Sequence, residues 1–377
     1  MAGKGNKTTA LVKRTERQLA RGADETKQAA RVERFGLADA ATLAQMDAIS
    51  SKIQSESMPA NTKRARTHGA AAWVRYCAWA GIQTSTVDAA SLRMFGTWLI
   101  TKGRIVPKGE PERGYAEATA RNRMATCLMW MRDVEGIELS TSDVAAGTKG
   151  ISEALAVQQD RGLDERGRGQ AREVSISQLD AMIMTVSGDR PADFRNRALL
   201  LVAWSIAART QELANLRVRD IIRTDTAQYV IRVGKGKTKA SARDVVVDRD
   251  ADDPQFCVVA ALDAWLAVLD RYGKAQPTDH LFPAISRAGQ VGAQMTAQAA
   301  RNVIKAAGKA AGVTFSVTGH SIRSGFVTAA FDADTPKSQT ARTGGWTEDS
   351  RAMTQVYNRT KQSGVAAGVR RKLKAQQ

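Results

Sequence analysis

Two charged pairs in the second half of the chain have the spacing of one helical turn. Arg209 and Glu212 occur in the apolar stretch AARTQELANL, and His320 and Arg323 occur in TGHSIRSGF. A charged pair in an apolar segment costs free energy unless it is satisfied, so the first pair is either a structural ion pair or a guanidinium aimed at an anion by its carboxylate. Thr318 can cap the helix of the second pair and place both side chains near its positive end. Together the pairs could bind a phosphate, although H-x-x-R alone recurs by chance.

Further side chains could act on a bound phosphate. Tyr357 is the only tyrosine after Tyr272. A phenol has a pKa of about 10, so it needs cationic surroundings to attack anything at neutral pH. Trp346 follows two glycines and either fills a core or offers one fixed N–H donor to an anion. Lys237, like its neighbours in the turn KGKTKASA, is either a reactive donor or a basic residue in water.

The elements that must position these side chains are mainly helices. If residues 194–221 form a helix, apolar side chains occupy almost every face of it. This pattern predicts one buried helix as the spine of the domain. QYVIRVG and RDVVVD are β-branched and alternating, and they predict an antiparallel hairpin around the lysine turn. The fold class is therefore mainly α with a small antiparallel β-hairpin or sheet. Further helices are expected at 256–273, 296–312, 319–333, 336–343 and 348–360.

Residues 37–157 predict a separate helical domain. One of its helices, at 61–81, is expected to begin at an Asn61 cap and to end at Gly81. Basic side chains crowd the first turns of its helices, where they are either solvated charges of an ordinary bundle or contacts to DNA. The candidates for DNA contact are Lys63, Arg64, Arg66, Arg121 and Arg123.

Polar segments flank and separate the two domains. Residues 1–36 are read as a basic, flexible arm, or equally as a solvated tail with no dedicated role. Residues 158–174 hold three glycines and many charges of both signs, which predicts a linker before a second domain at 175–377. Further candidates for DNA contact in the linker are Arg161, Arg166 and Arg168.

The charge balance points to a polyanionic partner. The 377 residues contain 56 Lys and Arg against 38 Asp and Glu, a formal net charge of +18. Nucleic acid is the first candidate and an anionic membrane the rival, but no run of 18 apolar residues exists to span a membrane. Three scattered cysteines and three histidines argue against a disulfide framework and against a protein-built metal site. We therefore expect a cytoplasmic protein with no metal and no membrane partner.

The order and context of the candidate residues resemble the tyrosine recombinase (phage integrase) family, most closely its Cre recombinase branch. The resemblance lies in VRDIIRTD…IRVGKGKT after Arg209, in HSIR and in GGWT. It covers the second domain, and in the first it extends only to the helical layout and the basic faces. One departure is the gap from Trp346 to Tyr357, which is two residues longer than the family pattern.

The resemblance implies a covalent reaction on DNA. Arg209 and Arg323 would clamp the non-bridging oxygens of the scissile phosphate, and Tyr357 would attack to form a 3′-phosphotyrosyl link. Strand exchange would then pass through a Holliday junction. Because that ester conserves the bond, rejoining needs no ATP, which fits the lack of a GxxxxGK[ST] loop in the sequence. No cofactor is expected.

The resemblance also implies supporting roles. Lys237 would protonate the leaving 5′-hydroxyl, and His320 would assist proton transfer at the nucleophile. Trp346 would donate to a phosphate oxygen, and Glu212 would orient the site.

For partners, the resemblance implies two recombination sites in double-stranded DNA and a homo-tetramer formed on them. The two domains would form a C-shaped clamp round the duplex. The tail after Tyr357 has Val365, Val369 and Leu373 at helical spacing, so it is expected to dock onto a neighbouring protomer, or alternatively onto its own domain. Two other functions stay open: a non-catalytic sequence-specific DNA-binding protein, and a type IB topoisomerase or telomere resolvase. The resemblance also implies a bacterial or phage-encoded, nucleoid-associated protein.

Overall fold

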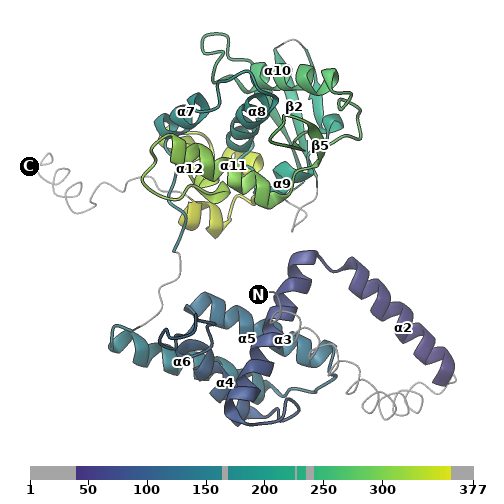
Figure 1. The fold of residues 1–377 in the computed structure, drawn as a ribbon, viewed down its shortest axis with the longest axis vertical. Coiled ribbons are helices and arrows are strands. Elements are labelled where there is room, and N and C mark those ends of the chain that lie inside the picture. The colour runs from purple at the N-terminus through teal and green to yellow at the C-terminus, as the bar shows by residue number, and fades with distance from the viewer. Residues whose placement is uncertain (1–39, 164–168, 226, 235–241, 358–377) are drawn as a thin grey trace, which may run out of the picture. The chain divides into compact units, whose positions relative to one another are not determined.

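The computed structural model describes residues 40–163, 169–225, 227–234 and 242–357 (Figure 1). The chain divides into two compact units, with the boundary between Gly169 and Gln170. This boundary falls inside the segment 158–174 that composition predicts as a linker. Among the described residues, no helix is both long enough and apolar enough to cross a membrane.

The described part of the first unit is helical and has an aromatic core. Trp73, Tyr76 and Phe95 have no exposed surface. The rings of Trp73 and Phe95 meet edge to face with their centroids 5.2 Å apart, and the ring centroid of Tyr76 lies 5.3 Å from each of them. Helices α3 and α5 pack against each other, and α4 packs against α6. The helices are α2 (Ala40–Ser57), α3 (Ala60–Ala80), α4 (Ala89–Thr101), α5 (Glu117–Asp133) and α6 (Thr141–Asp160).

The start of α3 differs from its prediction. The helix begins at Ala60, and the carbonyl of Pro59 accepts from the backbone N–H of Thr62 and Lys63, so Asn61 lies inside the first turn and is not the cap. Pro59 therefore holds the N-cap position that was expected for Asn61. The proline ring fixes φ near the value that this position needs. The end of α3 at Gly81 is confirmed, because Gly81 has a φ of 69° and its N–H binds the carbonyl of Cys77.

Glycines allow α4 and α6 to pack at close range. A Cβ added to Gly96 would lie 2.4 Å from the carbonyl oxygen of Gly147, and one added to Gly150 would lie 2.1 Å from the carbonyl oxygen of Arg93. Such distances are too short for any side chain, so the backbones of the two helices are nearly in contact.

The second unit combines helices with two small antiparallel sheets. The predicted hairpin is confirmed: β2 pairs with β3 from Gln228 with Asp248 to Val233 with Arg243, and β1 adds an outer strand. The strands are β1 (Ile221–Arg223), β2 (Gln228–Val233), β3 (Arg243–Asp248), β4 (Pro283–Ile285) and β5 (Val291–Gln294). The helices are α7 (Ile176–Met184), α8 (Pro191–Ser205), α9 (Thr210–Asn215), α10 (Val258–Arg271), α11 (Ala297–Ala310), α12 (Gly319–Asp332) and α13 (Lys337–Gly344), with a 3₁₀ turn η1 (Val218–Asp220) and a π-helical turn η3 (Ala352–Tyr357).

Helix α8 forms the centre of the second unit (Figure 1). It contacts α7, α9, α10 and α12, and its residues from Ala198 to Val202 are at most 4% exposed. The expected buried spine is therefore present, but a single helix over 194–221 is wrong. The chain breaks between Ser205 and Thr210, where Ala207 adopts a left-handed φ of 44°. No glycine or proline marks this break in the sequence.

The packing of α4 on α6 gives a stability test. Gly96→Ala should lower the free energy of unfolding of the first unit by about 1–3 kcal/mol, because the new methyl group meets backbone and the helices must separate. Urea unfolding of the full chain, followed by tryptophan fluorescence, measures this loss.

Gly147→Ala is the matched control in the same interface. Its Cβ would meet only the tip of Met124 at 3.0 Å, which can move, and alanine favours the helix by about 1 kcal/mol over glycine. Equal losses for the two variants would contradict the close approach of the backbones.

Candidate active site

Two buried arginines lie between the C-terminal ends of α8 and α13. Arg243, the first residue of β3, donates from Nη2 to the carbonyl of Ile206 at 2.8 Å and from Nε to the carbonyl of Thr343 at 2.6 Å. Arg323 of α12 donates from Nη1 to the carbonyl of Ala207 and from Nη2 to the carbonyl of Gly344 at 2.6 Å. Helix ends leave carbonyl groups without partners in the helix, and here the two guanidiniums supply the donors.

Ala207 owes its position to this arrangement. A left-handed φ costs an alanine about 1 kcal/mol or more, and it persists only where surrounding contacts determine it. The carbonyls of Ala203 and Trp204 accept from the N–H groups of Ala208 and Ala207 and close the end of α8. The carbonyl of Ala207 itself is turned to Arg323. The helix break therefore brings Arg209 to the start of a new helix directly beside the buried arginines.

Arg209 and Glu212 form a close ion pair at the start of α9. Arg209 Nη1 lies 2.6 Å from Glu212 Oε1, and the backbone N–H of Arg209 donates to Glu212 Oε2 at 2.9 Å. Arg243 Nη2 adds a third bond to Glu212 Oε2 at 3.1 Å. The Arg209 side chain is 37% exposed and that of Glu212 only 8%. Both interpretations of this pair therefore hold: it is a structural ion pair, and it also fixes an accessible guanidinium.

The carboxylate of Glu212 stays charged in this site. Burial alone would raise its pKa, but the charge of Arg243 and the hydrogen bonds from Arg209 and Arg243 outweigh burial and lower the pKa below its ordinary value. Glu212 therefore carries a full negative charge at neutral pH and can hold both arginines.

Helix α12 brings His320 to Arg209. As predicted, Thr318 caps the helix, with its Oγ1 accepting from the N–H of Ser321 at 3.2 Å. A Cβ on Gly319 would lie 2.6 Å from Thr210 Cγ2, so the first turns of α12 and α9 are in contact. His320 is exposed, yet its pKa is lowered, first by loss of hydration and then by the charges of Arg323 and Arg209. Its imidazole is consequently neutral at neutral pH and can accept a proton.

Trp346 covers the guanidinium of Arg323. The Cζ of Arg323 lies 3.5 Å from the centroid of the indole ring, a cation–π contact, and Arg323 has no exposed surface. Gly344 permits this placement, since a Cβ there would lie 1.7 Å from Trp346 Cζ3. Of the two guanidiniums, that of Arg209 is therefore the accessible one, and that of Arg323 lies beneath Trp346.

Tyr357 ends the π-helical turn η3, which contacts α12. Met353 of this turn is fully buried against Val327 of α12 and Ala341 of α13. The helix expected at 348–360 begins later than predicted, at residue 351, because residues 348 and 349 form a turn. The side chain of Tyr357 and the whole of Lys237 lie outside the described residues.

The candidate DNA contacts of the first unit divide into three groups: residues of a cleft, exposed residues and residues in ion pairs. Arg64 and Arg123 line one cleft of about 460 Å³ between α3 and α5, together with His68. The pKa of His68 is lowered by burial and then by Arg123, Arg64 and Arg75, so the cleft is positively charged. Lys63 and Arg161 are exposed.

Other candidates of this unit are held by carboxylates. Arg66 pairs with Asp133 at 2.8 Å with both side chains less than 20% exposed, and Arg121 pairs with Glu117 at 2.8 Å. Arg66 therefore has a structural partner that the sequence did not reveal. Arg166 and Arg168 lie outside the described residues.

Arg243 is the site residue that the sequence reasoning missed. A signal was present: Arg243, Val245 and Val247 face inward along β3, so an arginine occupies a position where the alternation calls for an apolar side chain. Within the residues that the structure describes, no group of His, Cys, Asp and Glu could hold a metal ion. The site gathers guanidiniums, a neutral imidazole and a helix N-terminus, a combination suited to a phosphate diester.

Comparisons with known proteins agree on one family. Residues 174–363 match the phage integrase family. Recombinase cre of Escherichia phage P1 is 27% identical over 48% of this chain and 54% of its own length. Tyrosine recombinase XerD of Mycobacterium leprae is 31% identical over 59% of this chain and 64% of its own length. The chain thus spans between half and two thirds of these relatives.

A solved structure shares the fold. A lambda integrase dimer bound to a COC′ core site superposes with a TM-score of 0.54 and 12% identity, over 85% of this chain and 96% of the other. At this identity the likeness concerns the fold alone, which confirms the mainly helical class with small antiparallel sheets.

The charge of Glu212 gives a test of the site by pH. Glu212→Gln should lower the free energy of unfolding at pH 7 by about 1–3 kcal/mol, because two guanidiniums lose their charged acceptor. Since the folded pKa of Glu212 is depressed, its contribution is full above the unfolded value of about 4.3 and is lost as pH falls through the folded pKa.

Urea unfolding of both proteins between pH 3 and 7 checks this. The difference between wild type and variant should shrink as the pH falls below about 4.3. A difference that stays constant across this range would mean that the carboxylate charge does not hold the site.

Proposed function

The chain belongs to the phage integrase family, and on that basis we propose that it is a site-specific DNA recombinase that cuts and rejoins DNA through a 3′-phosphotyrosyl intermediate. The observation that carries the proposal is the convergence of Arg209, His320 and Arg323 at the first turns of α9 and α12, with Glu212 fixing Arg209. Tyr357 follows on a turn that contacts α12.

In the proposed reaction, the phenol oxygen of Tyr357 attacks the scissile phosphorus and the 5′-oxygen of the next nucleotide leaves. Arg209 donates directly to a non-bridging oxygen, where negative charge grows as the attack proceeds. Arg323 adds its charge from beneath Trp346, and its direct contact with the phosphate requires a shift of the indole. Preorganised donors of this kind contribute about 10²–10³ each in rate.

Proton transfers complete the reaction. His320 is neutral at neutral pH because its pKa is lowered, so it can accept or relay the phenol proton of Tyr357. Lys237 would protonate the leaving 5′-hydroxyl, and Trp346 would donate its indole N–H to a phosphate oxygen. Attack of the released hydroxyl of a second strand on the phosphotyrosyl ester then restores a phosphodiester without ATP or metal. Two such exchanges, separated by a Holliday junction, recombine two sites.

The first unit would hold the duplex. The cleft between α3 and α5 supports this, because Arg64 and Arg123 meet there in a positive environment. Lys63, next to Arg64 in the sequence, and Arg161 at the end of α6 add exposed charge. Arg66 and Arg121 contribute mainly through their ion pairs. Such contacts to phosphates make binding salt-dependent and independent of sequence. The substrate would be chromosomal or phage DNA in a bacterial cytoplasm.

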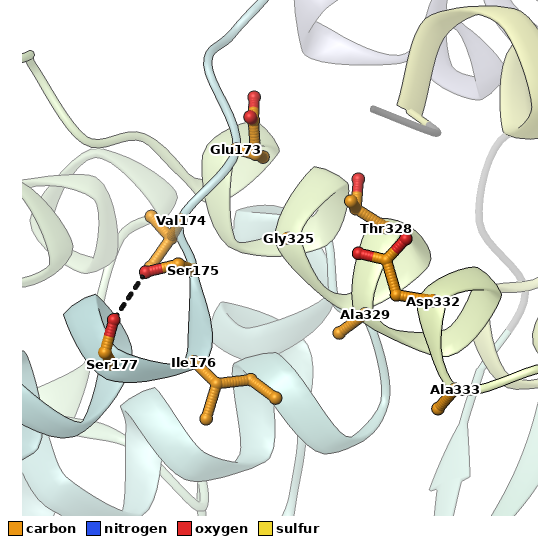
Figure 2. A pocket seen from close by; sticks show the side chains of 10 residues that line it. All are labelled: Glu173, Val174, Ser175, Ile176, Ser177, Gly325, Thr328, Ala329, Asp332 and Ala333. Carbon is orange, nitrogen blue, oxygen red and sulfur yellow. Dashed lines mark hydrogen bonds between the residues drawn. The ribbon is translucent and has the colours of Figure 1, made fainter. Parts of the chain in front are cut away.

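The tail would assemble four protomers on the DNA. A pocket of about 730 Å³ in the second unit supports an acceptor for it (Figure 2). The pocket is lined by Ile176, which is 57% exposed, by Ala329, and by the carboxylates of Glu173 and Asp332. This lining suits a segment that is both apolar and basic, and the tail carries Val365, Val369 and Leu373 beside Arg370, Arg371, Lys372 and Lys374.

The pocket is separate from the phosphate site. Gly325, Thr328, Ala329 and Asp332 share one face of α12, and Arg323 lies on the opposite face by helical periodicity. Occupation of the pocket by another protomer would therefore leave the phosphate site open to DNA.

The nucleophile is tested by trapping covalent protein–DNA adducts. Nicked fragments of the source genome allow the cleaved end to diffuse away, so that adducts resistant to SDS accumulate. Wild type should form adducts and Tyr357→Phe should form none while binding DNA equally well. Sequencing of the trapped DNA then gives the recombination site.

Tyr272→Phe is the matched control, since Tyr272 is a 46% exposed tyrosine of the same unit and should be dispensable. Adducts formed by Tyr357→Phe would mean that another residue attacks. No adducts from wild type, despite tight DNA binding, would favour a non-catalytic DNA-binding protein.

The tail is tested by deletion of residues 363–377. The deletion should abolish recombination between two sites, because protomers no longer dock, and should leave binding to one half-site mostly intact. Ala329→Arg should have the same effect if the tail occupies the pocket. Gel-shift and recombination assays on the sequenced site measure both properties, and unchanged recombination after the deletion would refute assembly through the tail.

A further inference from the structure

Arg243 is an arginine in a position built for an apolar side chain. It begins β3, and its neighbours on the inward face of the strand are Val245 and Val247. Its side chain is 3% exposed. Burying a guanidinium is costly unless its donors are satisfied, so this position must be maintained by specific contacts.

Those contacts reach three separate segments of the second unit. Arg243 binds the carbonyl of Ile206 after α8, the carboxylate of Glu212 in α9 and the carbonyl of Thr343 in α13. Ile206 and Glu212 lie on either side of the break between α8 and α9, whereas Thr343 lies 100 residues after Arg243 in the sequence. The first residue of β3 joins these segments at one point.

Each of these segments holds a residue of the phosphate site. Glu212 fixes Arg209 through bonds of 2.6 and 2.9 Å. The residues after Ile206 and Thr343, which are Ala207 and Gly344, give their carbonyls to Arg323. The three groups that Arg243 binds are thus each one step removed from an arginine of the proposed phosphate site.

We infer that Arg243 is a positioning residue of the phosphate site, which sets Arg209 through Glu212 and Arg323 through the ends of α8 and α13. Its side chain is 3% exposed and binds a carboxylate and two carbonyls of the protein, so it acts through Arg209 and Arg323 and not on a substrate. Arg323 is also buried, but it is the indole of Trp346 that covers the face of its guanidinium. Its role in the reaction rests on the proposed function, whereas its role in placing the two arginines does not.

The chemistry of the side chain explains why arginine is needed. A guanidinium presents five N–H donors in a planar fork, so it can bind a carboxylate and two carbonyls in fixed directions. A lysine keeps the charge but offers three donors from one point. A methionine has a similar length and offers none.

His320 provides a reporter of the arginines that needs no DNA. The pKa of His320 is lowered by partial loss of hydration, by Arg323 and by Arg209, so displacement of either arginine changes the value. The chain has only three histidines, and the NMR signals of their rings can be assigned by replacing each with glutamine. His68 and His280 report on the folding of the first and second units in the same sample.

The test compares the pKa of His320 in wild type and in Arg243→Met. The variant should raise the pKa of His320 toward its ordinary value by about half a unit or more, the size expected when a nearby charge moves away by a few ångström. Glu212→Gln should shift His320 in the same direction, and the double variant should add little because both act on Arg209. Arg243→Lys should fall between wild type and Arg243→Met.

Arg195→Met is the matched control. Arg195 is a second buried arginine of the same unit, 7% exposed, and it donates to the carbonyl of Pro283 at 3.2 Å, away from the phosphate site. Its loss should cost stability and leave the pKa of His320 unchanged. If Arg243→Met does not fold, His280 also returns to its ordinary pKa, and Arg243→Lys then decides the question.

Adduct formation supplies the second readout. Arg243→Met should form covalent adducts about 10²-fold more slowly than wild type with unchanged DNA binding, since a displacement of about 1 Å can cost that much. An unchanged pKa of His320 in a folded Arg243 variant would overturn the inference. If wild type formed no adducts, the proposed function would fail, and the histidine titration would still decide the role of Arg243.

Discussion

The structure of the site depends on two buried guanidiniums that complete the ends of two helices. The carbonyls at the ends of α8 and α13 need donors. Arg243 and Arg323 each bind one carbonyl at the end of α8 and one at the end of α13. This double bridge fixes the distance between the helices and stabilises the left-handed Ala207. Because α9 starts directly after that turn, the same bridge sets where Arg209 begins the next helix. The scaffold and the binding site are consequently one network of hydrogen bonds.

The network also sets the charge of the site. Arg209 and Arg243 share a single buried carboxylate, that of Glu212, and Arg323 binds only backbone carbonyls among the contacts described, so positive charge is in excess. The first turn of α12 adds its dipole to this positive charge. The pKa of His320 is lowered first by loss of hydration and then by the charges of Arg323 and Arg209. In the proposed function, a phosphate diester would supply the missing negative charge, and a neutral imidazole beside it would move a proton. The net charge of +18 over the chain would draw DNA toward such a site.

Local sequence patterns predicted the helices and strands well. Tertiary contacts explain most of the differences between the predicted and the observed elements. Alternation gave the β2–β3 hairpin, and the Thr318 cap gave the start of α12, since both depend on neighbours in sequence. The break after α8 was missed because it contains no glycine or proline and depends on donors more than thirty residues away. The partner of Arg66, Asp133, was hidden for the same reason. The candidate phosphate residues were chosen from the sequence, whereas Arg243 was missed although the alternation along β3 marks it as an arginine on the inward face.

A structure of the Tyr357→Phe chain bound to its sequenced DNA site would test the central claim most directly. We expect a backbone phosphate within hydrogen-bond distance of Arg209 and His320, with Arg323 behind it. Arg243 should still bind the carbonyls of Ile206 and Thr343 and should make no contact with DNA. A phosphate bound elsewhere, or one held by Arg243 itself, would rule out the proposed site.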